Sequence, residues 1–108
     1  MKRVKRGNIF AQVPGELRDE VFEALVQERG VTIERIISNG QASPPSGWYD
    51  QQQHEWVMVL QGEASIAFEN GPVMHLGKGD YLTIPAHCRH RVIHTSSGTA
   101  TIWLAVHY

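Results

Sequence analysis

The chain has 108 residues and a formal net charge of −1, with ten Lys and Arg residues against eleven Asp and Glu residues. This length holds one domain, because two separate cores would leave neither with enough buried surface to be stable. Hydrophobic residues make up 42% and charged residues 19%, a composition that excludes a disordered segment. The near-neutral charge argues against a protein that coats nucleic acid or an anionic membrane, since both need a concentrated basic field.

We expect neither a membrane span nor a secretory leader. No apolar run approaches the roughly 20 residues that cross a bilayer, and the basic residues 2–6 are not followed by the apolar stretch of a signal peptide. Cys88 is the only cysteine in the sequence, so no internal disulfide can form, which agrees with a reducing compartment. The sequence therefore predicts a small soluble cytoplasmic domain with no membrane or nucleic-acid partner.

The first predicted element is a short amphipathic helix over residues 16–28. Leu17, Val21 and Leu25 recur there at four-residue steps. A Pro-Gly pair precedes this stretch and Gly30 follows it, as at the two ends of a helix. We expect residues 1–30 to form an N-terminal arm and helix that pack on a β-barrel.

Residues 31–108 predict an all-β domain of short strands. Gly, Pro and Asn-Gly signals place a loop at residues 39–47 and tight turns near residues 70 and 78. Between them, β-branched and alternating apolar residues indicate strands at 31–37, 56–60, 64–68, 73–76, 81–84, 91–94 and 99–108. Short strands at this spacing are typical of a sandwich or a barrel.

Two segments of the chain resemble the two sequence motifs of the cupin superfamily. Residues 47–63 hold Glu55 followed seven positions later by a glycine, which is similar to the end of the first motif. Residues 79–94 begin with glycine, and a proline there is followed five positions later by His90, which is similar to the second motif. The resemblance implies a jelly-roll barrel, a double-stranded β-helix, over a single cupin domain of residues 1–108. It leaves the function open, because one fold hosts many chemistries.

The cupin resemblance also implies a divalent first-row metal ion in the barrel mouth, held by two His and a Glu from the first motif and one His from the second. Glu55 and His90 match two of these four ligands, whereas Tyr49 and Gln51 stand where the other two histidines are expected. A phenol and a neutral amide oxygen are weaker ligands than imidazole. The departure predicts a looser, oxygen-rich site for iron, manganese, nickel or zinc.

Side chains alternate between the two faces of a strand, so their positions predict which of the other histidines near the two motifs point inward. His54 adjoins Glu55 and is therefore expected to face away from the interior. His90 and His94 share a parity, so we expect both to point inward, with His94 about 13 Å further along and too distant to share one ion. His87 lies in a turn where parity gives no guidance, and it either folds back over the cavity as a ligand or stays on the surface.

The remaining candidates have ordinary structural interpretations. His75 and His107 are interpreted as strand residues without a chemical role. Cys88 has no acidic partner near it in the sequence, so we interpret it as a small core residue rather than as a nucleophile.

Two hypotheses for the function follow. The first is a metal-dependent enzyme such as a dioxygenase or an isomerase, with Tyr49 or His94 orienting the substrate or moving a proton. Its metal ligands are Gln51, Glu55, His87 and His90. The second is a non-catalytic module that binds or senses a small ligand without metal, in which a Glu55–His90 ion pair satisfies the buried carboxylate.

The sequence also predicts a homodimer. Residues 56–60 and 101–108 carry apolar side chains at both strand parities. A small sandwich with two apolar surfaces often covers one of them with a second copy.

Overall fold

The computed structural model describes residues 3–44 and 46–108; the first two residues of the basic start and one position of the predicted loop at 39–47 lie outside that range. The described residues form eight strands and no helix, which confirms the all-β class. The strands are β1 (Val21–Glu28), β2 (Val31–Ser38), β3 (Glu55–Gln61), β4 (Ala64–Phe68), β5 (Val73–Leu76), β6 (Tyr81–Ile84), β7 (His90–Thr95) and β8 (Thr101–His107).

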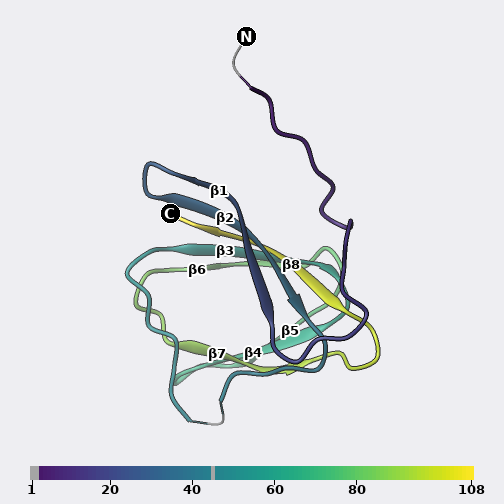
Figure 1. Ribbon diagram of the computed structural model, residues 1–108. Coiled ribbons are helices and arrows are strands. Elements are labelled where there is room, and N and C mark those ends of the chain that lie inside the picture. The colour runs from purple at the N-terminus through teal and green to yellow at the C-terminus, as the bar shows by residue number, and fades with distance from the viewer. Residues whose placement is uncertain (1–2, 45) are drawn as a thin grey trace.

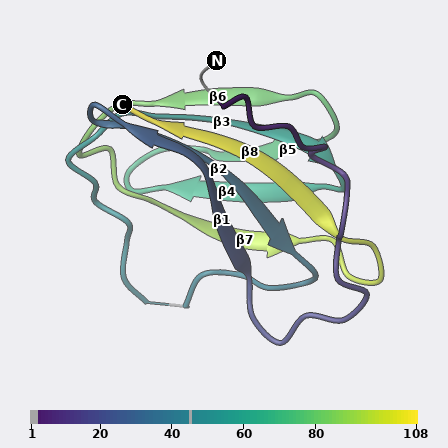
Figure 2. The same ribbon diagram turned by 45° about the horizontal axis from the view of Figure 1, so that its top comes forward.

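The strands form two sheets that face each other (Figures 1 and 2). One sheet has five strands in the order β1-β2-β8-β3-β6, and the other has three in the order β5-β4-β7. Every pairing is antiparallel. β3 lies in the larger sheet and β7 in the smaller one, so the residues of the two motifs meet across the space between the layers.

The predicted helix over residues 16–28 is wrong, because residues 21–28 form β1 at the edge of the larger sheet. This strand pairs with β2 from Val21↔Ile37 to Glu28↔Val31. Arg29 and Gly30 both have positive φ, 51° and 78°, as in the two-residue turn of a tight hairpin. Gly30 therefore closes a hairpin instead of ending a helix, and strand pairing overrides the weak helical periodicity.

A buried arginine ties the N-terminal arm to this hairpin. Arg35 of β2 is 5% exposed, and its guanidinium donates to the carbonyls of Ile9 and Ala11 at 3.0 and 2.6 Å. It also donates to both carboxylate oxygens of Glu23 on β1, at 2.8 and 3.0 Å. These bonds satisfy a charge that burial would otherwise make costly.

The core lies between the two sheets. Alternate residues of the strands point inward, and the buried cluster comprises Ile36, Val57, Val59, Ala64, Ile66, Leu76, Ile84, Trp103 and Ala105. The turn from β3 to β4 requires glycine: Gly62 has φ +85°, and a Cβ there would lie 2.9 Å from the Thr101 Cα. No side chain fits this close approach of two backbones.

No helix in the described part of the chain is long and apolar enough to cross a membrane.

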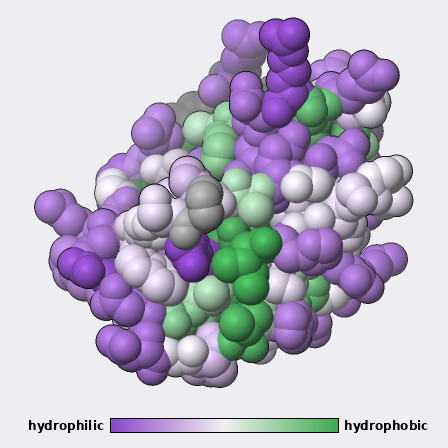
Figure 3. Space-filling model, turned by 90° about the horizontal axis from the view of Figure 1, so that it is seen from below, coloured by the Kyte–Doolittle hydropathy of each residue, from purple (hydrophilic) through white to green (hydrophobic). Residues whose placement is uncertain are grey.

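Seen from below, a narrow apolar strip runs between polar side chains on the surface (Figure 3).

Candidate functional site

A cavity of about 130 Å³ lies between the two sheets. Its walls are mostly apolar and aromatic: Phe22, Ile36, Tyr49, Val57, Ile66, Ile84, Val92 and Trp103. The polar residues that line it are Glu20, Glu34, Gln51, Glu55, His90 and His107. An apolar cleft with a few converging polar groups is the usual form of a small-molecule site.

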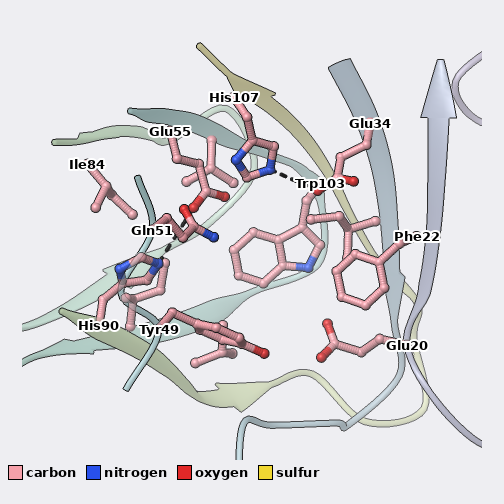
Figure 4. Close-up of a pocket in the computed structure, with 14 residues that line it drawn as sticks. Glu20, Phe22, Glu34, Tyr49, Gln51, Glu55, Ile84, His90, Trp103 and His107 are labelled. Atoms are coloured by element: carbon pink, nitrogen blue, oxygen red, sulfur yellow. Dashed lines mark hydrogen bonds and ion pairs between the residues drawn. The ribbon is translucent and has the colours of Figure 1, made fainter. Parts of the chain in front are cut away.

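Glu55 and His90 meet in this cavity from opposite sheets (Figure 4). Glu55 begins β3 and His90 begins β7. His90 Nε2 lies 3.5 Å from Glu55 Oε1, and the two side chains are only 7% and 11% exposed. His90 Nδ1 donates to the carbonyl of Cys88 at 2.8 Å. Because a carbonyl only accepts, this bond fixes the proton on Nδ1 and leaves Nε2 facing Glu55.

The surroundings of His90 raise its pKa above the ordinary value of 6.5. Burial opposes the charged form and is the largest single influence. The hydrogen bond to Glu55, the bond to the Cys88 carbonyl and the charge of Glu55 together outweigh it. The imidazolium form is thus stabilised inside the cavity.

The segment of residues 49–51 is held against the start of β7 and the turn before it by backbone hydrogen bonds. Tyr49 and His90 exchange two of them, at 2.8 and 3.2 Å, and the His87 amide donates to the Gln51 carbonyl at 2.8 Å. The Tyr49 ring consequently lies 5.8 Å from the His90 ring, centre to centre. The structure brings together four of the site residues named from the sequence: Tyr49, Gln51, Glu55 and His90.

His87 and His94 do not line the cavity. The His87 side chain is 65% exposed and hydrogen-bonds Asp50 at 2.7 Å. The inward direction expected for His94 is wrong, and that side chain is exposed. Ser65 of β4 pairs with His94, but Ile66 pairs with Val92. The extra residue between them is a β-bulge, which reverses the alternation that parity assumes.

His54 and Cys88 also lie outside the cavity lining. His54 Nδ1 accepts from the Ala86 amide at 3.0 Å, and its ring lies 5.4 Å from that of Tyr108. Cys88 packs partly buried against the core. Its carbonyl, not its thiol, serves the site through His90.

The sequence interpretation missed a second carboxylate–imidazole pair in the cavity. His107 Nε2 donates to Glu34 Oε1 at 2.9 Å, with side chains 16% and 18% exposed. His107 is also the direct cross-strand partner of Glu55, and Figure 4 shows its ring between the two carboxylates. The available signal was the charge of Glu34, which shares the parity of the apolar Ile36 in the predicted strand.

A third carboxylate, Glu20, is oriented by a short chain of hydrogen bonds. The indole Nε1 of Trp103 donates to the Ser38 hydroxyl at 3.3 Å. That hydroxyl in turn donates to Glu20 Oε2 at 2.8 Å. Ser38 is fully buried, so the chain holds the carboxylate at the edge of the cavity beside Trp103.

The side chains that line the cavity do not fit the metal centre that the cupin resemblance implies. Within residues 3–44 and 46–108, no three His, Cys, Asp or Glu side chains lie close enough to hold one ion. Glu55 and His90 are two strong metal ligands, whereas protein sites for first-row ions commonly supply three or more ligands. Gln51 lines the same cavity, but its neutral amide does not replace two imidazoles.

Comparison with solved structures reveals the same architecture in several bacterial proteins. A protein of Ralstonia eutropha JMP134 described as a "putative mannose-6-phosphate isomerase" is 54% identical, with a TM-score of 0.93 over 96% of this chain and 97% of that one. A cupin superfamily protein of Desulfitobacterium hafniense DCB-2 is 21% identical, with a TM-score of 0.76 over 97% and 92% of the two chains. A protein of Thermus thermophilus is 15% identical, with a TM-score of 0.78 over 96% of each chain.

No curated protein sequence matches this chain. The family model of the cupin domain matches residues 35–107, from the second strand to the end of the last. That match covers well over half of the 108 residues, and it includes Glu55, His90 and the whole of both motifs. The chain therefore belongs to the cupin family.

Proposed function

We propose that this cupin binds a small organic molecule in its cavity and that the Glu55–His90 pair exchanges a proton with it. The observation that carries the proposal is the burial of this pair, 3.5 Å apart and 11% and 7% exposed, on the wall of a cavity. A carboxylate and an imidazole out of water are poor fillers of a core. A titratable group with a shifted pKa that lines a cleft, as His90 does, is typical of functional sites.

Each polar group has a defined part in the proposed chemistry. His90 can donate or accept a proton at Nε2, because Nδ1 is anchored on the Cys88 carbonyl. Glu55 favours the protonated imidazole, as the direction of the His90 pKa indicates. Gln51 and Tyr49 line the same wall, and we assign them to hydrogen bonds that orient the bound molecule.

The name of the Ralstonia protein suggests an isomerase of a phosphorylated sugar. Proton transfer by a carboxylate–imidazole pair suits isomerisation. The phosphate does not suit this cavity, because no Lys or Arg is among the residues that line it, and phosphate sites in proteins rely on such groups. We therefore carry over the proton transfer but not the phosphorylated substrate.

A metal-dependent enzyme, the first hypothesis from the sequence, is the competing proposal. Of the four metal ligands named from the sequence, Gln51, Glu55 and His90 line the cavity and His87 does not. Metal analysis of untagged protein decides between the two. Stoichiometric iron, manganese, nickel or zinc that is lost in a Glu55→Gln variant would overturn the metal-free proposal.

Nuclear magnetic resonance of the histidine rings tests ligand binding in the cavity. We expect cyclohexanol, a small molecule with one hydroxyl, to shift the ring signals of His90 and His107 but not that of the exposed His87. A Val92→Phe variant fills the cavity and should abolish the shifts while leaving the protein folded. Equal shifts in the filled variant, or no shift in the wild type at saturating probe, would refute the proposal.

The homodimer predicted from the sequence also stays a proposal. Leu25 and Val26 are 47% and 44% exposed on β1, which is one of the two edge strands of the larger sheet. An exposed edge strand with apolar side chains favours association with another strand. Sedimentation equilibrium at micromolar concentration checks this, and a Leu25→Lys, Val26→Lys variant is expected to be monomeric.

A further inference from the structure

The cavity carries a surplus of negative charge. Three carboxylates line it, Glu20, Glu34 and Glu55, against two imidazoles and no Lys or Arg. Even if both His90 and His107 are protonated, three negative charges face two positive ones. In a cavity that is only partly open to water, such an imbalance opposes an anionic ligand and favours a cationic one.

The surplus is concentrated at Glu20. Glu34 and Glu55 each lie beside an imidazole, at 2.9 and 3.5 Å. The partner that the structure gives Glu20 is the neutral Ser38 hydroxyl, at 2.8 Å. That bond fixes the direction of the carboxylate without neutralising it, so Glu20 is the anion best placed to bind a charged ligand.

Three aromatic rings surround the same end of the cavity. Figure 4 shows Phe22, Trp103 and Tyr49 around a common space, with the Glu20 carboxylate beside it. Trp103 is 3% exposed and forms the floor, whereas Phe22 and Tyr49 are 57% and 44% exposed and mark the mouth. Aromatic faces attract organic cations through the negative charge of their π systems, and clusters of such rings recognise substituted ammonium groups.

We propose that the natural ligand is a small organic cation, an amine or substituted ammonium on a compact apolar body. This inference rests on the proposed function and specifies the class of molecule that the cavity takes. The ammonium group lies among Phe22, Tyr49 and Trp103 and pairs with Glu20. The apolar body extends toward Ile66 and Val92, which places its far end near the Glu55–His90 pair.

Three probes of similar shape and different charge test the proposal by isothermal titration calorimetry at pH 7.5. They are cyclohexylamine, cyclohexanol and cyclohexanecarboxylate. We expect the amine to bind about tenfold more tightly than the alcohol, and the carboxylate not to bind. In a Glu20→Gln variant the amine should weaken to the affinity of the alcohol, while the affinity of the alcohol stays unchanged.

Two further variants sharpen the assignment. Phe22→Leu keeps an apolar side chain at the mouth but removes the ring, and it should weaken the amine several-fold more than the alcohol. Glu16→Gln removes a carboxylate from an exposed position outside the cavity and should change neither affinity.

The possible failures are distinguishable. If the alcohol binds as tightly as the amine and Glu20→Gln changes neither, the cavity still binds small molecules, and the inference about charge is overturned. If cyclohexanecarboxylate binds best, the charge argument is reversed. If no probe binds, both this inference and the proposed function are refuted.

Discussion

Two carboxylate–imidazole pairs lie near the start of β7, one on the surface and one in the cavity, and their histidines are only three positions apart. Asp50 and His87 form the first, with 2.7 Å between their atoms and side chains that are 37% and 65% exposed. Glu55 and His90 form the second, with a longer separation of 3.5 Å but side chains that are 11% and 7% exposed. By distance alone, the outer pair would rank as the stronger.

Burial reverses that ranking. Water and ions screen the outer pair, which also shares Arg89 at 3.2 Å from Asp50. The hydrogen bond from His87, then that from Arg89, holds the pKa of Asp50 below its ordinary value of 3.8. The inner pair is out of water, so neither member can lose its partner without leaving a buried polar group behind. Substitutions in the two pairs measure this difference, and we expect those in the buried pair to have the larger effects.

The largest expected effect is on stability. His90→Ala removes an imidazole that packs near the rings of Tyr49 and Phe68, 5.8 and 6.0 Å away, and leaves Glu55 as a buried carboxylate. We expect the free energy of unfolding to fall by about 3–5 kcal/mol, the usual cost of breaking a buried pair. Urea denaturation at pH 6 measures it.

His87→Asn is the matched control for that measurement. His87 has φ 61°, a conformation that asparagine adopts readily, and its ring is mostly in water. We expect little change in the unfolding midpoint. Equal loss of stability in the two variants would contradict the claim that burial separates the pairs.

The next effect is on the titration of His90. Glu55→Gln keeps the shape of the side chain but removes the charge that raises the His90 pKa, so burial, which lowers it, prevails. We expect the pKa of His90 to fall below that in the wild type, as read from its ring proton signals. An unchanged His90 pKa would show that Glu55 is not its electrostatic partner.

Most of the fold could be predicted from the sequence, because alternation and turn residues are local signals. The strands near Ile66, Ile84 and Trp103 lie where those signals place them. The error at residues 16–28 has a definite cause: apolar residues at four-residue steps also occupy alternate positions of a strand. Only the pairing of β1 with β2 decides between the two, and that contact is tertiary.

The site could be predicted only in part, for the same reason. Tyr49, Gln51, Glu55 and His90 follow from the motif spacing, and all four line the cavity. His107 could not be predicted from the motif spacing, because its role depends on its position opposite Glu55 in the sheet register. A register shift also turned His94 outward, and no local pattern in the sequence marks that bulge.

A smaller effect is expected in the pH dependence of stability. Folding raises the pKa of His90. The stability contributed by its protonated ring is therefore fully present below a pH of about 6.5, and it is lost as the pH rises through the pKa of the folded state. The stability difference between the wild type and Glu55→Gln should therefore shrink from pH 5.5 to pH 8.5. Urea denaturation at four pH values measures it. A difference that grows with pH would reverse the assigned sign.

The smallest effect is expected at the outer pair, in its dependence on salt. Asp50→Asn removes the carboxylate that joins His87 and Arg89, and it should lower the unfolding midpoint slightly in dilute buffer at pH 7. The distance over which exposed charges still interact is about 10 Å at 0.1 M salt and falls to about 3 Å at 1 M. The wild type and Asp50→Asn should thus converge in 1 M sodium chloride, whereas the deficit of His90→Ala should persist, because Glu55 and His90 are only 11% and 7% exposed and salt screens them little. A deficit of Asp50→Asn that survives 1 M salt would mean that Asp50 acts through the local backbone of residues 49–51 and not through its charge.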